Sequence, residues 1–311
     1  MIKKPTIQIN AELKPTKNKT INVRHYCNIG DQIASLIALK RYYELTGKKS
    51  IYCQQLDVRA RYYDGAIHPV LKDGKQVMCN AAIWKMMVPL MKAQEYIADA
   101  QVYTGQPLGI SEDQEVIGID LTIIRQHIFV NLPNQAIQQW LFIAFPDIAT
   151  DISKAWVKVP NKVNVSNCKL KYGRSFKKIN LHSLSDKVLV NFTQRYRNEH
   201  MDYFYLKQYE DKLIFTGTET EHKLFCKTWG LKMPLLIVND FLQLAYIMKR
   251  CKFILCNQSF CWNLAESMKI PRTLELCVGA PNCQAFIGED SYGYLNQQGN
   301  VAYFMLLMSK K

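Results

Sequence analysis

The fold class is decided by residues 213–276, LIFTGTETEHKLFCKTWGLKMPLLIVNDFLQLAYIMKRCKFILCNQSFCWNLAESMKIPRTLEL, where short apolar runs alternate with longer segments of helical periodicity. Together with Val188–Phe192 upstream, the apolar runs predict strands over Leu213–Phe215, Leu235–Val238, Phe253–Cys256 and Thr273–Leu276. The segments between them predict helices over His200–Tyr209, Glu219–Trp229, Asp240–Arg250 and Ser259–Met268. Such alternation is typical of a parallel sheet covered by helices, so this half is expected to be an α/β, Rossmann-like domain.

The first half opens in the same order. Residues Thr20–Tyr26 suit a strand, Asn28–Asp31 a tight turn, Gln32–Thr46 an amphipathic helix and Lys49–Cys53 a second strand. Further along, the pattern predicts a helix over Ala81–Ala100, a strand over Ile128–Leu132 and a helix over Ile137–Phe145. A second Rossmann-like domain is therefore expected here, although most of Leu56–Gly118 has no clear periodicity.

The segment between the two halves is basic. In Pro160–Lys187, six Lys and Arg side chains and no acidic residue precede Asp186: Lys162, Lys169, Lys171, Arg174, Lys177 and Lys178. This composition is typical of an exposed linker. We therefore predict a first domain over 1–165, a basic interdomain linker over 166–187 and a second domain over 188–311, with a central cleft between the domains.

Composition limits the protein class. The 311 residues are 48% hydrophobic, which is enough for packed cores, and no apolar run approaches the roughly 20 residues of a membrane helix. The Met1–Pro5 start lacks a signal-peptide core, and most of the ten cysteines lie in apolar segments, so a cytoplasmic protein with buried, reduced thiols is expected. The net charge of +14 favours anionic partners, but a lysine-rich solvated surface would give the same value.

Several common motifs are absent. The turn Asn28–Asp31 lacks the glycines of a dinucleotide-binding fingerprint, and Gly47–Ser50 lacks the upstream glycine of a P-loop. There is no G-x-S-x-G nucleophile elbow and no H-E-x-x-H pair. A D-x-D pair, which some glycosyltransferases use to hold a donor diphosphate through a divalent cation, is also missing. No cofactor and no metal site are therefore expected.

Polar residues follow three of the predicted strands in the second half. The ends of parallel strands meet at one edge of a sheet, where open α/β sheets bind ligands. Arginine, hydroxyl groups, a glycine and a helix N-terminus together suit a pyrophosphate. The candidate residues are Thr193, Arg195, Arg197, Thr216, Gly217, Asn257, Gln258 and Ser259. Helix caps and a solvated loop remain alternative interpretations of the same residues.

In the first half, Asp31 lies where the first strand gives way to the first helix. A carboxylate at this position can stabilise the helix dipole or cap the helix. It can also act as a general base at the mouth of a cleft. His25 is the nearest rival base, but its position inside the predicted strand favours a packed histidine.

Two segments resemble a known family. Asn28-Ile29-Gly30-Asp31-Gln32-Ile33 is similar to the G-D-x-(I/L/V) opening of the ADP-heptose:lipopolysaccharide heptosyltransferases, and residues 256–271 resemble that family's late motif, a small polar triplet before H-L-A-x-A-L-x-x-P. This chain has Asn257-Gln258-Ser259 and Asn263 where the family has Asp-(Ser/Thr)-Gly and a histidine, so the identity of the donor cannot be carried across.

The resemblance implies two Rossmann-like domains in the GT-B arrangement and an inverting, metal-independent glycosyltransferase. The nucleotide sugar would bind the second domain and the acceptor the first. Asp31 would be the catalytic base, Pro160–Lys187 the hinge region, and a helix over Ala302–Met308 would cross back onto the first domain.

The basic segment suggests an anionic acceptor such as a glycan, lipopolysaccharide or modified DNA, held by Lys169, Lys171, Lys177 and Lys178. Peripheral membrane association is a further option. The alternatives are a basic nucleic-acid-binding protein on an α/β scaffold and a nucleotide-sugar epimerase of the same fold.

Overall fold

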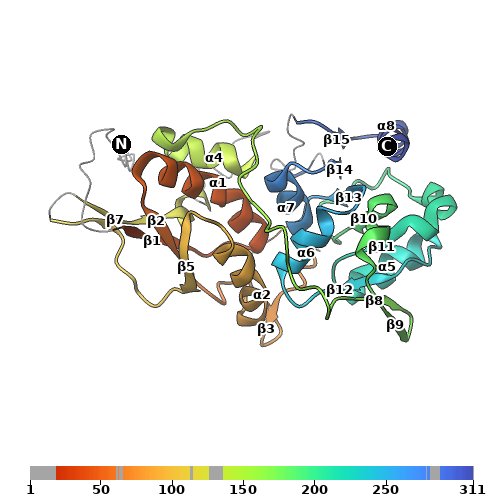
Figure 1. Cartoon of the computed structure of the whole chain (residues 1–311), viewed down its shortest axis with the longest axis horizontal. Coiled ribbons are helices and arrows are strands. Elements are labelled where there is room, and N and C mark those ends of the chain that lie inside the picture. The colour runs from red at the N-terminus through yellow and green to blue at the C-terminus, as the bar shows by residue number, and fades with distance from the viewer. Residues whose placement is uncertain are drawn as a thin grey trace.

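The computed structural model describes residues 19–60, 62, 66–112, 115–125, 136–277, 279–280 and 288–310. They form two sheets side by side along the long axis of the molecule, with helices between and around them (Figure 1). The prediction of a mixed α/β protein with parallel sheets is confirmed. The predicted strand Ile128–Leu132 lies outside the described residues.

The first sheet has five strands in the order β5-β2-β1-β7-β6, parallel except for the pair β6–β7. Its strands are β1 (Thr20–His25), β2 (Lys49–Gln54), β5 (Ile97–Val102), β6 (Gly109–Ile110) and β7 (Val116–Asp120). The helices of this half are α1 (Ile29–Thr46), α2 (Ala81–Lys92) and α4 (Ile137–Ala144), with 3₁₀ turns η1 (Leu121–Arg125) and η2 (Pro146–Ile148) and a small hairpin, β3 (Leu71–Lys72) and β4 (Lys75–Gln76).

The second sheet has eight strands in the order β15-β14-β13-β10-β11-β12-β8-β9. They are β8 (Lys169–Tyr172), β9 (Ser175–Lys178), β10 (Val188–Asn191), β11 (Leu213–Phe215), β12 (Leu235–Ile237), β13 (Phe253–Asn257), β14 (Arg272–Glu275) and β15 (Ser291–Tyr294). The six strands from β10 to β15 are parallel and have the 3-2-1-4-5-6 order of a Rossmann fold. The point where that order reverses lies between β10 and β13.

Alternating side chains of this sheet face two layers. Leu189 packs toward a core shared with the first half, whereas Val188 and Val190 pack into a second core on the other face. The shared core includes α6 (Phe241–Met248) and α7 (Phe260–Met268), which lie between the second sheet and helices α1 and α2. The outer core is covered by α5 (Glu219–Trp229), α8 (Gln297–Ser309) and the 3₁₀ segment η4 (Phe204–Lys212), while η3 (Leu181–Asp186) precedes β10.

One tryptophan joins the halves. The Trp156 indole Nε1 donates to the Ile33 carbonyl in α1 at 2.9 Å, and its backbone N–H donates to the Ser267 carbonyl in α7, also at 2.9 Å. Trp156 is 1% exposed. Because these bonds link helices from the two halves, they fix the edge along which the two sheets face each other.

Local predictions failed where tertiary contacts decided the outcome. The helix predicted over Ala81–Ala100 ends at Lys92, and the chain then enters β5, which pairs with β2. The predicted turn Asn28–Asp31 is the start of α1, capped by Asn28. The helix predicted over His200–Tyr209 is the 3₁₀ segment Phe204–Lys212.

Two larger predictions were also wrong. The basic linker is not an open loop, because residues 169–178 form the hairpin β8–β9, whose first strand pairs antiparallel with β12. The last helix does not cross back onto the first domain. It packs on the outer face of the second sheet, with Phe304 against Phe253, and lies at the far end of the molecule in Figure 1.

No helix among the described residues is long and apolar enough to span a membrane. Nine cysteines are described, seven of them buried, as expected from their apolar surroundings.

Candidate functional site

A cavity of about 320 Å³ lies between the two halves, at the carboxyl ends of strands from the second sheet. We call it the cleft cavity. The second half contributes Asn191, Thr193, Arg195, Thr216, Gly217, Thr218, Glu221, Leu236, Ile237, Val238, Phe241, Leu244, Ser259, Phe260 and Cys261. The first half contributes Asn28, Ile29, Gly30, His68, Pro69, Val70, Met78, Ile83 and Met86. The cavity therefore lies at the reversal point of the strand order, and its lining contains both apolar and polar side chains.

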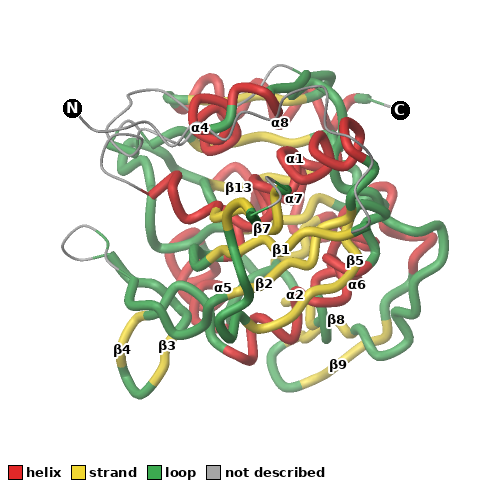
Figure 2. The backbone as a smooth tube through the Cα atoms, turned by 90° about the vertical axis from the view of Figure 1, so that its left-hand side faces the viewer, coloured by secondary structure: helices red, strands yellow, loops and turns green. Residues whose placement is uncertain are grey.

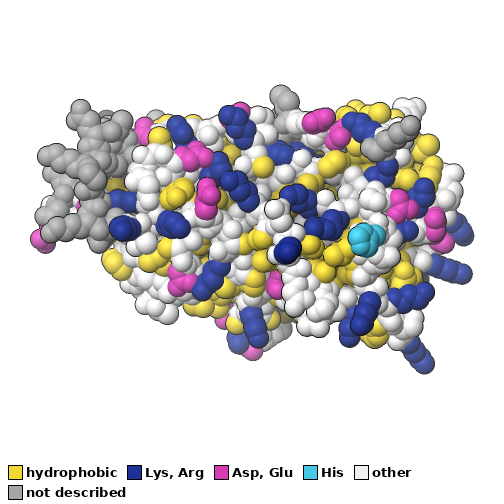
Figure 3. Space-filling view, in the orientation of Figure 1, with side chains coloured by type: hydrophobic (Ala, Val, Ile, Leu, Met, Phe, Trp, Pro, Cys, Tyr) yellow, Lys and Arg dark blue, Asp and Glu magenta, His cyan; other side chains and the backbone are white. Residues whose placement is uncertain are grey.

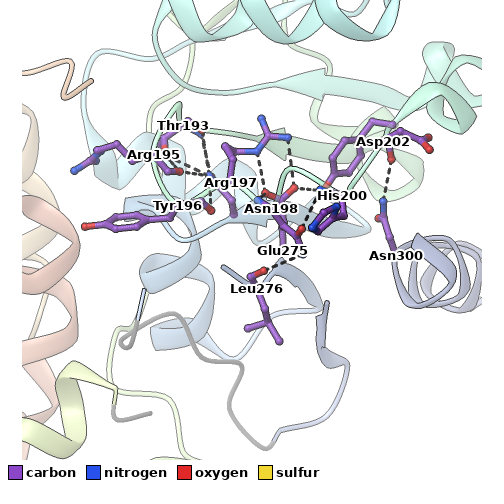
Figure 4. A network of polar contacts seen from close by, with 12 residues as sticks. Thr193, Arg195, Tyr196, Arg197, Asn198, His200, Asp202, Glu275, Leu276 and Asn300 are labelled. Carbon is purple, nitrogen blue, oxygen red and sulfur yellow. Dashed lines mark hydrogen bonds and ion pairs between the residues drawn. The ribbon is translucent and has the colours of Figure 1, made fainter. Parts of the chain in front are cut away.

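Arg195 brings a positive charge to the cavity. Its side chain follows β10, is 8% exposed, and lies over the Tyr62 ring of the first half, 4.6 Å from the ring centroid. Figure 4 shows Arg195 and Tyr196 extending toward the first half. Among the described residues no carboxylate forms an ion pair with Arg195, and its buried Nε has no hydrogen-bond partner. A buried guanidinium in this state is suited to an anionic ligand.

Arg197, two residues further, has a different role. Its Nε donates to Glu275 Oε1 at 2.9 Å, and the Glu275 carboxylate also accepts from the Asn198 backbone N–H at 2.7 Å and from the Tyr203 hydroxyl at 2.6 Å. Figure 4 shows Arg197 directed into this network. Arg197 does not line the cleft cavity, and its charge is paired with a fully buried carboxylate. Its contact with the donor stays a prediction.

The loop after β11 comes close to the cavity because of Gly217. Its φ of +142° is available to glycine, and an added Cβ would lie 3.1 Å from both Asn191 Nδ2 and Glu221 Oε2. Thr218 and Glu221 form a capping box at the start of α5, with the Glu221 carboxylate accepting from the Thr218 N–H at 2.9 Å. Burial raises the pKa of Glu221.

The predicted site residues that end β13 and follow it, Asn257 to Ser259, have different roles in the structure. Ser259 lines the cavity, caps α7 and donates from its hydroxyl to Asn191 Oδ1 at 2.6 Å. Asn257 and Gln258 do not line the cavity. Asn257 instead holds the loop that carries Arg195, since its Oδ1 accepts from the Thr193 N–H at 3.0 Å and its Nδ2 donates to the Arg195 carbonyl at 2.7 Å. The N-terminus of α7, with its partial positive charge, thus opens on the same cavity as Arg195.

The first half presents the start of α1 to the cavity. Asn28, Ile29 and Gly30 line it, and Asn28 Oδ1 accepts from the Asp31 backbone N–H at 3.3 Å. Asp31 is 3% exposed and is not itself among the lining residues. The helix cap is therefore Asn28, and the catalytic role of Asp31 stays a prediction. His25 is fully buried and stacks on Tyr52, as expected of a packed histidine.

His68 is a lining residue that sequence reasoning missed. Its Nε2 lies 2.9 Å from the Val77 carbonyl, which can only accept, so Nε2 carries the proton. Burial and the charge of Arg195 lower the pKa of His68 to about 4, and its Nδ1 has no hydrogen-bond partner among the described residues. The imidazole is therefore neutral near neutral pH, and its unprotonated Nδ1 is buried. It comes from a region without periodicity, so no sequence signal marked it.

The four lysines predicted to bind an acceptor, Lys169, Lys171, Lys177 and Lys178, are absent from the cavity lining and lie on the hairpin β8–β9. Their role toward an acceptor stays a prediction. No group of three His, Cys, Asp or Glu side chains that could hold a metal ion is found in the part of the chain that the structure describes.

No protein-family model and no curated protein sequence matches this chain. Its fold resembles two solved structures. E. coli heptosyltransferase WaaC with ADP-2-deoxy-2-fluoro heptose superposes with a TM-score of 0.52 at 9% identity, covering 93% of this chain and 98% of that one. E. coli ADP-heptose lps heptosyltransferase II gives a TM-score of 0.51 at 11% identity, with the same coverage. The chain thus has the GT-B fold of these two heptosyltransferases, with two Rossmann-like sheets facing a cleft.

Proposed function

We propose that this protein is an inverting, metal-independent glycosyltransferase that uses a nucleotide-sugar donor. The observation that carries the proposal is the buried Arg195 guanidinium, which has no ion-pair partner among the described residues and faces a cavity at the switch point of the second sheet. The N-terminus of α7 and the glycine loop after β11 border the same space. These three features suit a diphosphate, whereas apolar lining residues such as Ile237 and Phe241 suit a nucleobase.

In the proposed reaction, an acceptor hydroxyl oxygen attacks the anomeric carbon of the donor sugar. The bond from that carbon to the diphosphate oxygen breaks, and its electron pair leaves with the nucleoside diphosphate. Arg195 and the α7 N-terminus would stabilise the negative charge that develops there, and a base in the first half would take the hydroxyl proton. The acceptor is proposed to be anionic, such as a glycan, lipopolysaccharide or modified DNA.

Arg195→Gln tests the donor site. Because a hydrogen bond to a charged group contributes about 1.5–3 kcal/mol, the affinity for a nucleoside diphosphate should fall by about 10- to 150-fold. Affinity is measured by calorimetry, with the nucleotide chosen from a thermal-shift panel of nucleoside diphosphates and nucleotide sugars. A ligand at a hundred times its dissociation constant stabilises the folded state by about 2.7 kcal/mol.

Lys169→Gln removes the same charge on the hairpin and should leave the affinity unchanged. Equal losses in the two variants would contradict a diphosphate site at Arg195 and would indicate a nonspecific effect of net charge. The absence of stabilisation by any nucleotide in the panel would contradict the proposed function as a whole.

Metal independence has its own test. Transfer activity should survive an excess of EDTA, because the sequence has no D-x-D pair and the diphosphate charge would be met by Arg195 and the α7 N-terminus. Activity is measured as nucleoside diphosphate released after chelation and again after Mg²⁺ or Mn²⁺ is added back. Loss on chelation with recovery on metal addition would show that a cation holds the diphosphate.

A further inference from the structure

The hairpin β8–β9, residues 169–178, concentrates positive charge at the edge of the second sheet. We call it the basic hairpin. It carries Lys169, Lys171, Arg174, Lys177 and Lys178, and the sequence has no Asp or Glu between residues 152 and 185. All of its residues except Leu170 and Lys171 are exposed. Among the described residues, only Lys171 of these five cations forms an ion pair, with Glu219 at 2.9 Å.

Two exposed aromatic rings accompany these charges. Phe176 is 56% exposed and Tyr172 40%. The Lys169 ammonium lies 5.9 Å from the centroid of the Phe176 ring, and the Lys177 ammonium 5.1 Å from that of Tyr172. The register places Lys169, Lys171, Phe176 and Lys178 on one face of the hairpin and Tyr172 with Lys177 on the other. One face therefore combines three lysines with an aromatic ring, and the other combines one lysine with an aromatic ring.

Protection of the sheet edge does not explain this combination. Lysines on an edge strand such as β9 do discourage pairing with another chain. An exposed phenylalanine on the same strand has the opposite effect, because it adds apolar surface to an open edge. Edge protection thus accounts for the lysines but not for the exposed aromatic rings. A single binding partner that contacts both the lysines and the rings would account for both.

An anionic lipid surface can bind both the aromatic rings and the basic side chains. Aromatic side chains favour the headgroup level of a bilayer. Basic side chains are attracted to anionic headgroups, and each Lys or Arg near the surface raises the partitioning of the protein onto the membrane by about fivefold. Figures 1 and 2 show the hairpin projecting from the body as a two-stranded ribbon, and Figure 3 shows Lys and Arg side chains gathered around that end of the molecule. The projecting ribbon can lie against a broad charged surface, with the face that carries Lys169, Lys171, Phe176 and Lys178 toward it.

We propose that the basic hairpin binds the surface of an anionic lipid bilayer and so holds the protein at a membrane. None of its residues lines the cleft cavity, so this surface is separate from the site proposed for the donor. The proposal does not depend on the transferase reaction.

The test is flotation with lipid vesicles. Full-length protein should float with phosphatidylcholine vesicles that contain about 30% phosphatidylglycerol, and much less with pure phosphatidylcholine. Neutralising Lys169, Arg174, Lys177 and Lys178 together to Gln should lower the partition coefficient at least tenfold. A second variant, Phe176→Ser with Tyr172→Ser, should also lower it while leaving the net charge unchanged.

The matched control neutralises four exposed lysines elsewhere, Lys72, Lys75, Lys85 and Lys154, and so has the same net charge as the first variant. It should keep most of the binding. Equal losses in the control, or equal flotation with neutral vesicles, would overturn the proposal. It would also be overturned if a single-stranded oligonucleotide bound through the hairpin while anionic vesicles did not. Circular dichroism establishes that each variant is folded.

Discussion

Replacing Asp31 by Asn is expected to lower the turnover rate of the proposed transferase by about 10²- to 10⁴-fold, the usual cost of removing a general base. The substitution keeps the size of a side chain that is 3% exposed. It also keeps the helix cap, because the capping oxygen belongs to Asn28. Folding and donor affinity should therefore be unchanged, and the loss should appear in the rate of sugar transfer under saturating donor.

Two variants make the Asp31 experiment decisive. Asp120→Asn removes a carboxylate at the carboxyl end of β7 in the same sheet, where it pairs with Arg24, and should leave turnover unchanged. His68→Gln removes the neutral imidazole that lines the cavity. If Asp31→Asn binds donor and turns over at the wild-type rate, the Asp31 carboxylate only stabilises the helix dipole. A larger loss in His68→Gln would assign the base to His68.

Replacing Glu266 by Ala is expected to lower the free energy of unfolding by about 3–5 kcal/mol, because it leaves a buried cation without its partner. Glu266 and Arg272 are both fully buried and form an ion pair, and Lys269 completes the cluster. Burial lowers the pKa of both Lys269 and Arg272, and the Glu266 carboxylate opposes that shift. The Arg272 guanidinium carbon also lies 5.5 Å from the centroid of the Trp262 ring.

The stability of this variant is measured by urea denaturation, with the unfolding free energy extrapolated linearly to water. Glu44→Ala is the control, because Glu44 pairs with Lys40 on the surface of α1 and should contribute less than about 1 kcal/mol. Since α7 carries Glu266 and the Ser267 carbonyl that accepts from Trp156, the loss should also loosen the joint between the halves. Similar small losses in both variants would mean that water solvates the cluster around Arg272.

Much of the second half could be predicted because its signals are local. The helix Glu219–Trp229 has the predicted bounds, set by the Thr218 capping box and by Gly230 in the left-handed conformation. The strands over 213–215 and 253–257 follow from short apolar runs buried on both faces. Once the strands are parallel, their carboxyl ends must share an edge. That is why Thr193, Arg195, Thr216, Gly217 and Ser259 could be placed at one cavity without coordinates.

The tertiary structure alone decided which of the predicted residues face the cleft cavity. Arg195 and Arg197 are the same residue type two positions apart. Arg197 forms an ion pair with Glu275, 78 positions away, whereas Arg195 lines the cavity. His68 lines the cavity although it comes from a region without periodicity. The basic linker forms a hairpin because its first strand, β8, pairs with the edge strand β12. The sequence by itself determined most of the elements and the sheet edge at which the cleft cavity lies, since both depend on local periodicity and chain direction. Side-chain direction, charge compensation and edge pairing depend on partners distant in the chain, so only the folded molecule determines them.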